Sequence, residues 1–274
     1  MSVTDGRPAR PRLRWIWRIV ALATAAILAA PAAWLVGLRQ GLHHEYGPVT
    51  VYHHAITAVR VSATGDTVAI TAGRPGRVSV SSALGWFFTK PAVREIWHGT
   101  TLAVSVYCPV PGPFGRCSAN LILHVPAAVG VRVAVGTGTA TVTGLAGPVH
   151  VTATSGSLAL GNLAGPLWAT ATSGSITGMT GLNSPTVTAD VRSGSLALGF
   201  DRAPSSLRLA VGSGSGIVTV PPGTRYRLDP GLSSGVVHMS HGMSSPDSAG
   251  LIAARVGSGT LSIGYQSAPP AGSR

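Results

Sequence analysis

The chain has 274 residues, of which 45% are hydrophobic, only 10% are charged, 36 are glycine and 20 are proline. Such a turn-dense composition with many small residues is typical of all-β structure and argues against a helical bundle. The formal net charge is +12, but no run of basic residues follows Arg39. Specific nucleic-acid binding is therefore not expected.

The first expected element is a single-pass membrane anchor. Residues 19–38 contain no charged side chain and are flanked by Arg18 and Arg39. Twenty such residues are about the length that crosses a hydrocarbon core. Five arginines precede the segment, which places residues 1–18 in the cytoplasm as a basic tail and the rest of the chain outside. A cleaved signal peptide is the alternative, because small alanines surround Pro31.

Residues 39–130 are expected to form a juxtamembrane segment followed by an irregular β cap. Cys108 and Cys117 bracket a segment rich in proline and glycine. Turn formers bring flanking strands together, which predicts a disulfide that closes a short loop outside the cytoplasm. The two cysteines lack the paired CxxC spacing of a structural zinc site, so metal binding is not expected there.

Residues 131–265 contain a tandem repeat marked by a small tripeptide. Successive markers are 18, 18, 20, 20, 21 and 24 residues apart. Apolar residues recur six, four and two positions before the marker, and three and five positions after most markers. This alternation predicts a half-buried strand on each side of a tight turn. The repeat turns are Thr137-Gly138, Ser155-Gly156, Ser173-Gly174, Ser193-Gly194, Ser213-Gly214, Ser234-Gly235 and Ser258-Gly259.

A unit of this size cannot bury its apolar face alone, so successive units are expected to stack. The predicted fold is all-β: a repetitive β-solenoid with an irregular β cap at its N-terminal side, preceded by one transmembrane helix. An antiparallel β meander or sandwich is the alternative, because a two-residue hairpin and a solenoid corner both keep the flanking apolar residues inside. Residues 266–274 are expected to form a flexible tail.

The segments TATSGSLAL, TATSGSIT and ADVRSGSLALG resemble the repeats of the bacterial putative-adhesin family of β-strand repeat proteins. The resemblance covers about residues 131–265. It implies a β-solenoid behind an N-terminal membrane span, a place at the cell surface, and a role in adhesion or envelope-stress signalling. It supplies no catalytic residues.

No catalytic or metal site is expected. The carboxylates outside the span do not recur at matching positions of adjacent repeats, as the paired acids of a glycosidase would. Residues 231–235 match the G-x-S-x-G pattern around Ser233, but a nucleophile elbow needs a helix after it and the repeat predicts a strand. The pairs His43-His44 and His53-His54 are expected to be solvated, because adjacent side chains point apart in an extended chain.

The sequence therefore predicts a non-enzymatic, membrane-anchored extracellular protein. Its stacked polar face would serve as an adhesive or scaffolding surface for cell-wall polymer or another surface protein. The alternative is a sensory or regulatory membrane protein that reports envelope stress through the span. Neither function requires a cofactor.

Overall fold

The computed structural model of the chain describes residues 15, 18–30, 43–86, 89–108, 117–231 and 234–266. The chain divides into two units, Met1–His43 and His44–Arg274. In the first unit, residues 18–30 are helical. Residues 31–38 of the predicted span, most of the predicted basic tail and nearly all of the predicted C-terminal tail lie outside the described residues. Within the described part of the chain, no helix is both long enough and apolar enough to cross a membrane.

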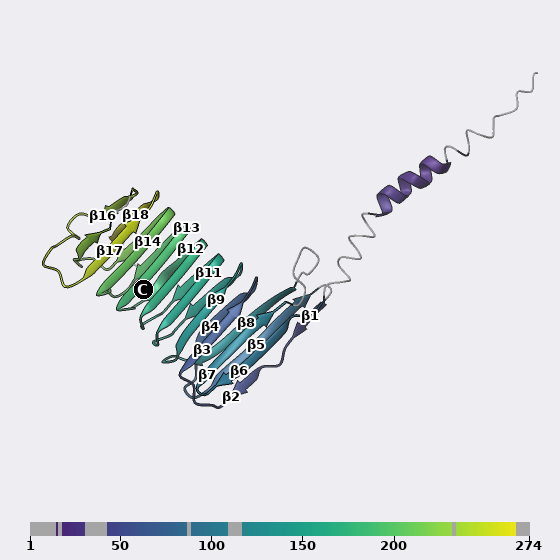
Figure 1. The fold of residues 1–274 in the computed structure, drawn as a ribbon, viewed down its shortest axis with the longest axis horizontal. Helices are drawn as coiled ribbons and strands as arrows, with labels where there is room; N and C mark the ends of the chain where they lie inside the picture. Colours follow the sequence, from purple (N-terminus) through teal and green to yellow (C-terminus); the bar gives the residue numbers. More distant parts are fainter. Residues whose placement is uncertain are drawn as a thin grey trace, which may run out of the picture. The chain divides into compact units, whose positions relative to one another are not determined.

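The rest of the described chain is all-β, as predicted (Figure 1). The strands are β1 (His43–Tyr46), β2 (Thr50–Tyr52), β3 (Ala58–Ala63), β4 (Thr67–Gly73), β5 (Val78–Trp86), β6 (Ala92–His98), β7 (Thr101–Tyr107), β8 (Cys117–Pro126), β9 (Gly130–Val135), β10 (Thr139–Thr143), β11 (Val149–Gly161), β12 (Leu167–Leu182), β13 (Thr186–Phe200), β14 (Ser206–Val220), β15 (Arg227–Pro230), β16 (Val236–Met239), β17 (Leu251–Val256) and β18 (Thr260–Tyr265).

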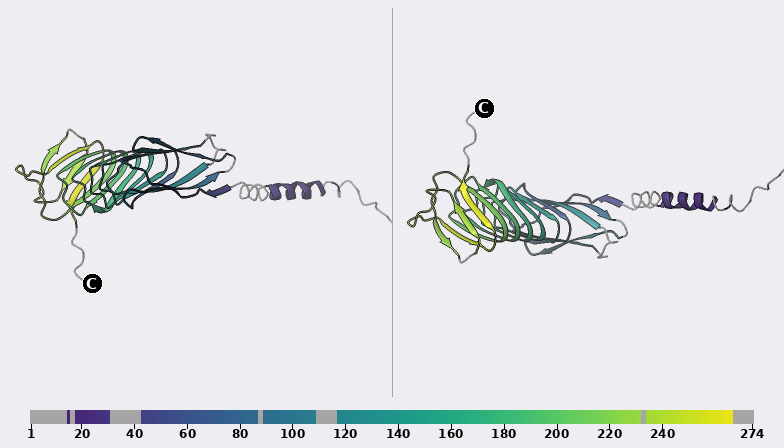
Figure 2. Two further views of the ribbon diagram at one scale, coloured as in Figure 1. Left: turned by 90° about the horizontal axis from the view of Figure 1, so that it is seen from below. Right: turned by 90° about the horizontal axis from the view of Figure 1, so that it is seen from above.

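Consecutive repeats pair in parallel at an offset of one repeat. β12 pairs with β13 and β13 with β14, so that Leu167 lies opposite Val187 and Val187 lies opposite Leu207. Each repeat thus adds one layer of strand to a stack, and Figures 1 and 2 show β11, β12, β13 and β14 side by side. We term each layer a rung. It consists of a first arm before the marker tripeptide, a corner at the tripeptide, and a second arm after it.

The marker tripeptides of β11 to β14 lie inside long strands, whereas Thr137-Gly138, Ser234-Gly235 and Ser258-Gly259 lie between strands. β11 continues through Ser155 and Ser157, and its pairing with β12 continues on both sides of this corner. The buried positions change phase there, from Val151 and Ala153 before the corner to Leu158 after it. A straight strand would keep a strict period of two. The one-residue shift shows that the strand bends, so that both arms face one core.

The repeat predicted the core correctly. The apolar residues before the markers are buried in six of the seven copies. Leu228, Val237 and Met239, which belong to the copy around Ser234, are only partly buried. The buried residues before the markers are Val131, Val133, Val135, Val149, Val151, Ala153, Leu167, Ala169, Ala171, Val187, Ala189, Val191, Leu207, Leu209, Val211, Ile252, Ala254 and Val256.

Two rungs precede the first marker. β3 and β4 pair in parallel with β9 and β10, which places Val59 opposite Val131 and Thr67 opposite Thr139. On their other side, β3 and β4 pair in parallel with β7 and β8. Among the described residues, antiparallel pairing occurs only near this end, where β5 pairs with β2 and β8, and β6 pairs with β7. The segment predicted as an irregular cap therefore contains two rungs in the register of the repeats.

The C-terminal rungs are stacked out of chain order. β14 pairs with β17 and β18. These strands in turn pair with β15 and β16. The last repeat of the sequence therefore lies between β14 and the preceding repeat, which forms the edge. Pro230 of β15 has no backbone N–H, and proline is tolerated on an edge strand.

Candidate functional site

A column of glycines follows the corners of the stack. A Cβ atom at Gly156 would strike the carbonyl oxygen of Gly138, and one at Gly194 would strike that of Gly174. Gly194 also has a φ of 141°, which residues with side chains rarely adopt. The column continues to Gly259, whose Cβ would meet the backbone of the rung beneath it in the same way. Glycine at the marker is therefore required because the rungs approach one another so closely.

Serine hydroxyls flank the glycine column. The Ser175 hydroxyl donates to Ser157 Oγ at 3.1 Å, and the hydroxyls of Ser213 and Ser258 share a hydrogen bond of 3.1 Å. A shallow depression of about 550 Å³ lies along three of these corners, lined by residues of the markers at Ser155, Ser173 and Ser193. Its walls offer only hydroxyls and backbone groups. It has the chemistry for weak polar contacts, and it lacks the ionisable groups of an acid–base site.

The outward side of the second arms is uncharged. No Asp, Glu, Lys or Arg occurs in β4, β8, β10, β16, β18 or the second arms of β11 to β14. Thr141 lies opposite Ala159, and Ala159 lies opposite Thr177. The exposed apolar residue Ile217 continues the same row. This second-arm face is therefore uncharged and consists largely of Thr and Ala, with Ile122 and Ile217 as exposed apolar residues.

The outward side of the first arms is basic and carries an aromatic stack. His150 and Trp168 lie directly opposite one another on β11 and β12. Their rings are parallel to within 2°, with centroids 4.1 Å apart. Burial, and then the charge of Arg132, lower the pKa of His150, so the imidazole is neutral at neutral pH. We term this surface the first-arm face. One row across it contains Arg60, Arg132, His150, Trp168, Thr188 and Arg208.

The apolar pattern and the markers do not reveal this row. From Arg132 to Arg208 its members lie five residues before each marker. The signal that identifies the row is the residue type at the outward position five residues before each marker. The row is built by the same register that aligns the core, because a parallel in-register ladder brings equivalent positions of successive repeats together.

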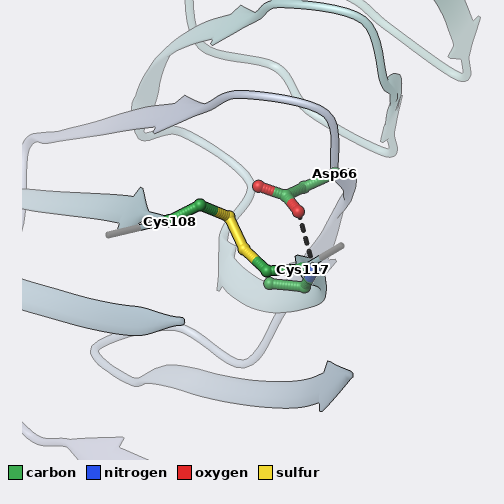
Figure 3. Close-up of a disulfide and its surroundings, with 4 residues drawn as sticks. Asp66, Cys108 and Cys117 are labelled. Atoms are coloured by element: carbon green, nitrogen blue, oxygen red, sulfur yellow. Dashed lines mark hydrogen bonds between the residues drawn. A yellow bond between two sulfur atoms is a disulfide. The ribbon is translucent and has the colours of Figure 1, made fainter. Parts of the chain in front are cut away.

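The cysteines and Asp66 lie at the N-terminal corners (Figure 3). Cys108 and Cys117 form a disulfide with their Cα atoms 6.2 Å apart. In the neighbouring rung, Asp66 Oδ1 accepts a hydrogen bond of 2.6 Å from the backbone N–H of Ala119. The Asp66 side chain is buried, and burial raises the pKa of its carboxyl. The disulfide and this hydrogen bond both hold the start of β8, so we assign them a structural role.

The other polar candidates are occupied by local contacts. Glu45, next to the first histidine pair, forms an ion pair with Lys90 at 2.6 Å. The His54 ring packs against Trp97 with centroids 4.9 Å apart. Across the described ranges, no three His, Cys, Asp or Glu side chains gather as metal ligands would.

The G-x-S-x-G match has no helix behind it. Ser233 itself lies outside the described residues. Ser234 donates its hydroxyl hydrogen bond to the carbonyl oxygen of Gly257 at 2.7 Å, and the chain continues as the strand β16. The local structure is therefore different from the strand–turn–helix of a nucleophile elbow.

No protein-family model matches the sequence, and no curated protein matches it. Among solved structures, the chain is similar to a putative adhesin from Bacteroides fragilis, with 12% identity, a TM-score of 0.45, and coverage of 81% of this chain and 97% of that one. It is also similar to a putative cell adhesion protein from Clostridium sporogenes, with 9% identity, a TM-score of 0.34, and coverage of 82% and 100%.

A third similar structure is a putative lipid binding protein from Parabacteroides distasonis, with 9% identity, a TM-score of 0.39, and coverage of 83% of this chain and 97% of that one. The names of the first two agree with the resemblance that the repeats suggested. At this distance, the likeness carries no information about a ligand or an activity of this chain.

Proposed function

We propose that the chain is a membrane-anchored β-solenoid that acts outside the cell as a non-enzymatic adhesive or scaffolding surface. Its partner would be cell-wall polymer or another surface protein. The observation that carries the proposal is the in-register repetition of exposed groups. Equivalent outward positions recur at every rung, at a strand spacing of about 4.8 Å.

The solenoid part of this proposal is supported by the direction and offset of pairing. From β3 to β18, the two arms of every rung pair in parallel with the corresponding arms of the neighbouring rung. A sandwich built from hairpins would instead pair consecutive strands in antiparallel fashion. The phase shift at each corner is also what a coil of two-sided rungs around one core requires.

The anchor is supported by the sequence alone. Residues 19–38 are uncharged and are preceded by five arginines, which favours retention of the N-terminus in the cytoplasm. A disulfide outside the span is compatible with that orientation, because disulfides persist in oxidising compartments. Protease treatment of intact cells tests this placement: the part after the span should be degraded while a tag at the N-terminus stays protected.

An adhesive role is supported by the shape and chemistry of the two faces. Both are open surfaces, and the depression at the corners is shallow. Such surfaces make weak contacts one by one, but a polymer that meets several rungs at once gains affinity by multivalency. A periodic surface of this kind suits a periodic partner.

The test is to incubate the full-length chain, kept in mild detergent, with purified cell-wall fractions and whole cells, and to follow retention and soluble product in the same tubes. We expect saturable retention without product release. An absence of retention would overturn the adhesive function, and released product would overturn the claim that the protein is not an enzyme.

A further inference from the structure

The first-arm face contains a more specific feature than general polarity. We propose that it binds an acidic polysaccharide, and that one charged sugar unit occupies a notch formed by Trp168, Thr188 and Arg208. This inference rests on the proposed function and names its ligand class. It follows from the positions of these three residues in one row across β12, β13 and β14.

The notch arises because a short side chain stands between two long ones. Trp168 lies opposite Thr188, and Thr188 lies opposite Arg208. Neighbouring strands are about 4.8 Å apart, so the backbones at Trp168 and Arg208, two strands apart, are separated by about 10 Å. Side chains of a strand stand roughly perpendicular to the sheet. The space above Thr188 therefore has an indole on one side and a guanidinium on the other.

The indole is held in place and remains accessible. His150 stacks on it from the neighbouring rung with a centroid distance of 4.1 Å, which covers the ring face turned toward β11. Trp168 is nevertheless 38% exposed. Since His150 covers the β11 side, the opposite ring face borders the space over Thr188. A fixed aromatic face presents apolar area at a low entropy cost, which suits the apolar C–H face of a pyranose ring.

The charges around the notch select an acidic ligand. Arg208 is exposed and forms no ion pair with a described acidic residue. A guanidinium pairs with a carboxylate through two parallel hydrogen bonds. Toward the corner, a depression of about 390 Å³ is lined by Arg192 and Arg255 together with Asp190. A polymer that leaves the notch in this direction meets two more arginines.

Asp190 favours a sugar over a nucleic acid. It lies two residues after Thr188 on the same face of β13 and is exposed. A carboxylate accepts hydrogen bonds from sugar hydroxyls, which a uronate unit carries beside its own charge and a DNA backbone lacks. Single-strand nucleic-acid sites also stack successive bases on several aromatic side chains, and Trp168 is the one Trp, Tyr or Phe of its row.

The test measures binding of the full-length chain in mild detergent to polygalacturonate, to neutral dextran of similar length, and to single-stranded oligodeoxythymidylate. Two variants remove the notch: Trp168→Thr, which places the neighbouring rung's residue there, and Arg208→Gln. Two controls make matched changes elsewhere: Ile217→Thr on the second-arm face and Arg94→Gln on β6. Thermal unfolding of each variant verifies that the stack is intact.

We expect wild-type protein to bind polygalacturonate and not dextran. Trp168→Thr should weaken binding about tenfold, which corresponds to about 1.4 kcal/mol. Arg208→Gln should weaken it about fivefold and reduce its salt dependence, since one screened charge contact is lost. The controls should bind like wild type.

Each contrary result has its own meaning. If wild type binds wall fractions but Trp168→Thr and Arg208→Gln bind polygalacturonate as well as wild type does, the notch is wrong and the adhesive function stands. Equal binding of dextran, or tighter binding of oligodeoxythymidylate, would also overturn the acidic-sugar site. If wild type is retained by no wall fraction and by no cells, the proposed function itself fails.

Discussion

The middle of the stack and its two ends use the same rung but connect it differently. In the middle, β11 to β14 are continuous strands that follow one another in chain order. At the ends, the arms are separate strands and the order changes. The rung of β3 and β4 lies inside that of β7 and β8, and the rung of β17 and β18 lies inside that of β15 and β16.

The difference shows how the stack protects its ends. A rung at the end of a repeat array has a neighbour on one side only and is prone to fray, which is why such arrays need caps. Here the first and last rungs along the chain each have neighbours on both sides. The edges are formed by other segments: short strands at one end, and antiparallel strands at the other. Both devices reduce the exposure of a long unpaired edge.

The largest effect should come from breaking the glycine column in the middle. Gly194→Ala would place Cβ against the backbone of Gly174 at a positive φ. We expect a loss of about 3–5 kcal/mol in the free energy of unfolding, because backbone strain and overpacking act together. Gly76→Ala is the matched control, since Gly76 has a φ of 68° but nothing within 4 Å of the added Cβ. In urea denaturation, Gly76→Ala should lower the free energy of unfolding by about 1 kcal/mol. Similar losses for both variants would refute the close approach of neighbouring rungs at Gly194.

The next effect tests the inverted order at the C-terminal end. Ile252 is fully buried between β14 and β15, whereas Leu228 of the edge rung is only partly buried. Ile252→Ala should therefore cost about 3 kcal/mol and Leu228→Ala about 1 kcal/mol, in proportion to the buried area removed. If the rungs were stacked in chain order, Leu228 would be internal and Ile252 terminal. A larger loss for Leu228→Ala in the same denaturation experiment would contradict the order described above.

The sequence predicts the middle far better than the ends, and the reason is physical. Apolar periodicity identifies which residues face a core, and all three positions before the markers in the middle copies are buried. It carries no information about which rung lies beside which. Thus Val59 and Val61 show the alternation, yet their pairing with β9 across more than sixty residues of chain depends on tertiary packing. The row of Trp168, Thr188 and Arg208 differs from this case, because its members follow the marker spacing. Apolar periodicity does not reveal it, since that periodicity reports only the inward positions.

The disulfide should stabilise the N-terminal end selectively. Replacing both Cys108 and Cys117 by serine should cost about 2–3 kcal/mol, the loop-closure term for a loop of this length. We expect hydrogen exchange to accelerate in β7 and β8 while β12 and β13 stay protected, because the middle rungs are held by their own neighbours. Single replacement is avoided, since it would leave a reactive thiol. Equal acceleration in the middle strands would show that end and middle unfold as one unit.

The smallest effect, and the one confined to a single corner, is the pH dependence contributed by Asp66. Burial raises its pKa above the ordinary value of 3.8, so the native state holds the proton more tightly than the unfolded chain. Stability from this group is therefore fully present below pH 3.8 and is lost as the pH rises through the folded pKa. Asp66→Asn keeps an oxygen to accept the Ala119 N–H bond but does not ionise.

Unfolding free energies of wild type and Asp66→Asn, measured from pH 3 to about pH 7, should therefore diverge in favour of the variant as the pH rises. Glu95→Gln is the matched control, because it also removes one carboxylate at the same end but leaves Asp66 buried. The hydrogen bond from Tyr52 to Glu95 raises the pKa of Tyr52 to about 12. Glu95→Gln should therefore also lower this pKa toward its ordinary value of 10.0. A constant difference between wild type and Asp66→Asn across this range would mean that the Asp66 carboxylate is hydrated in the folded protein. The corner beside the disulfide would then be open to water, as the serine-lined corners of the middle rungs are.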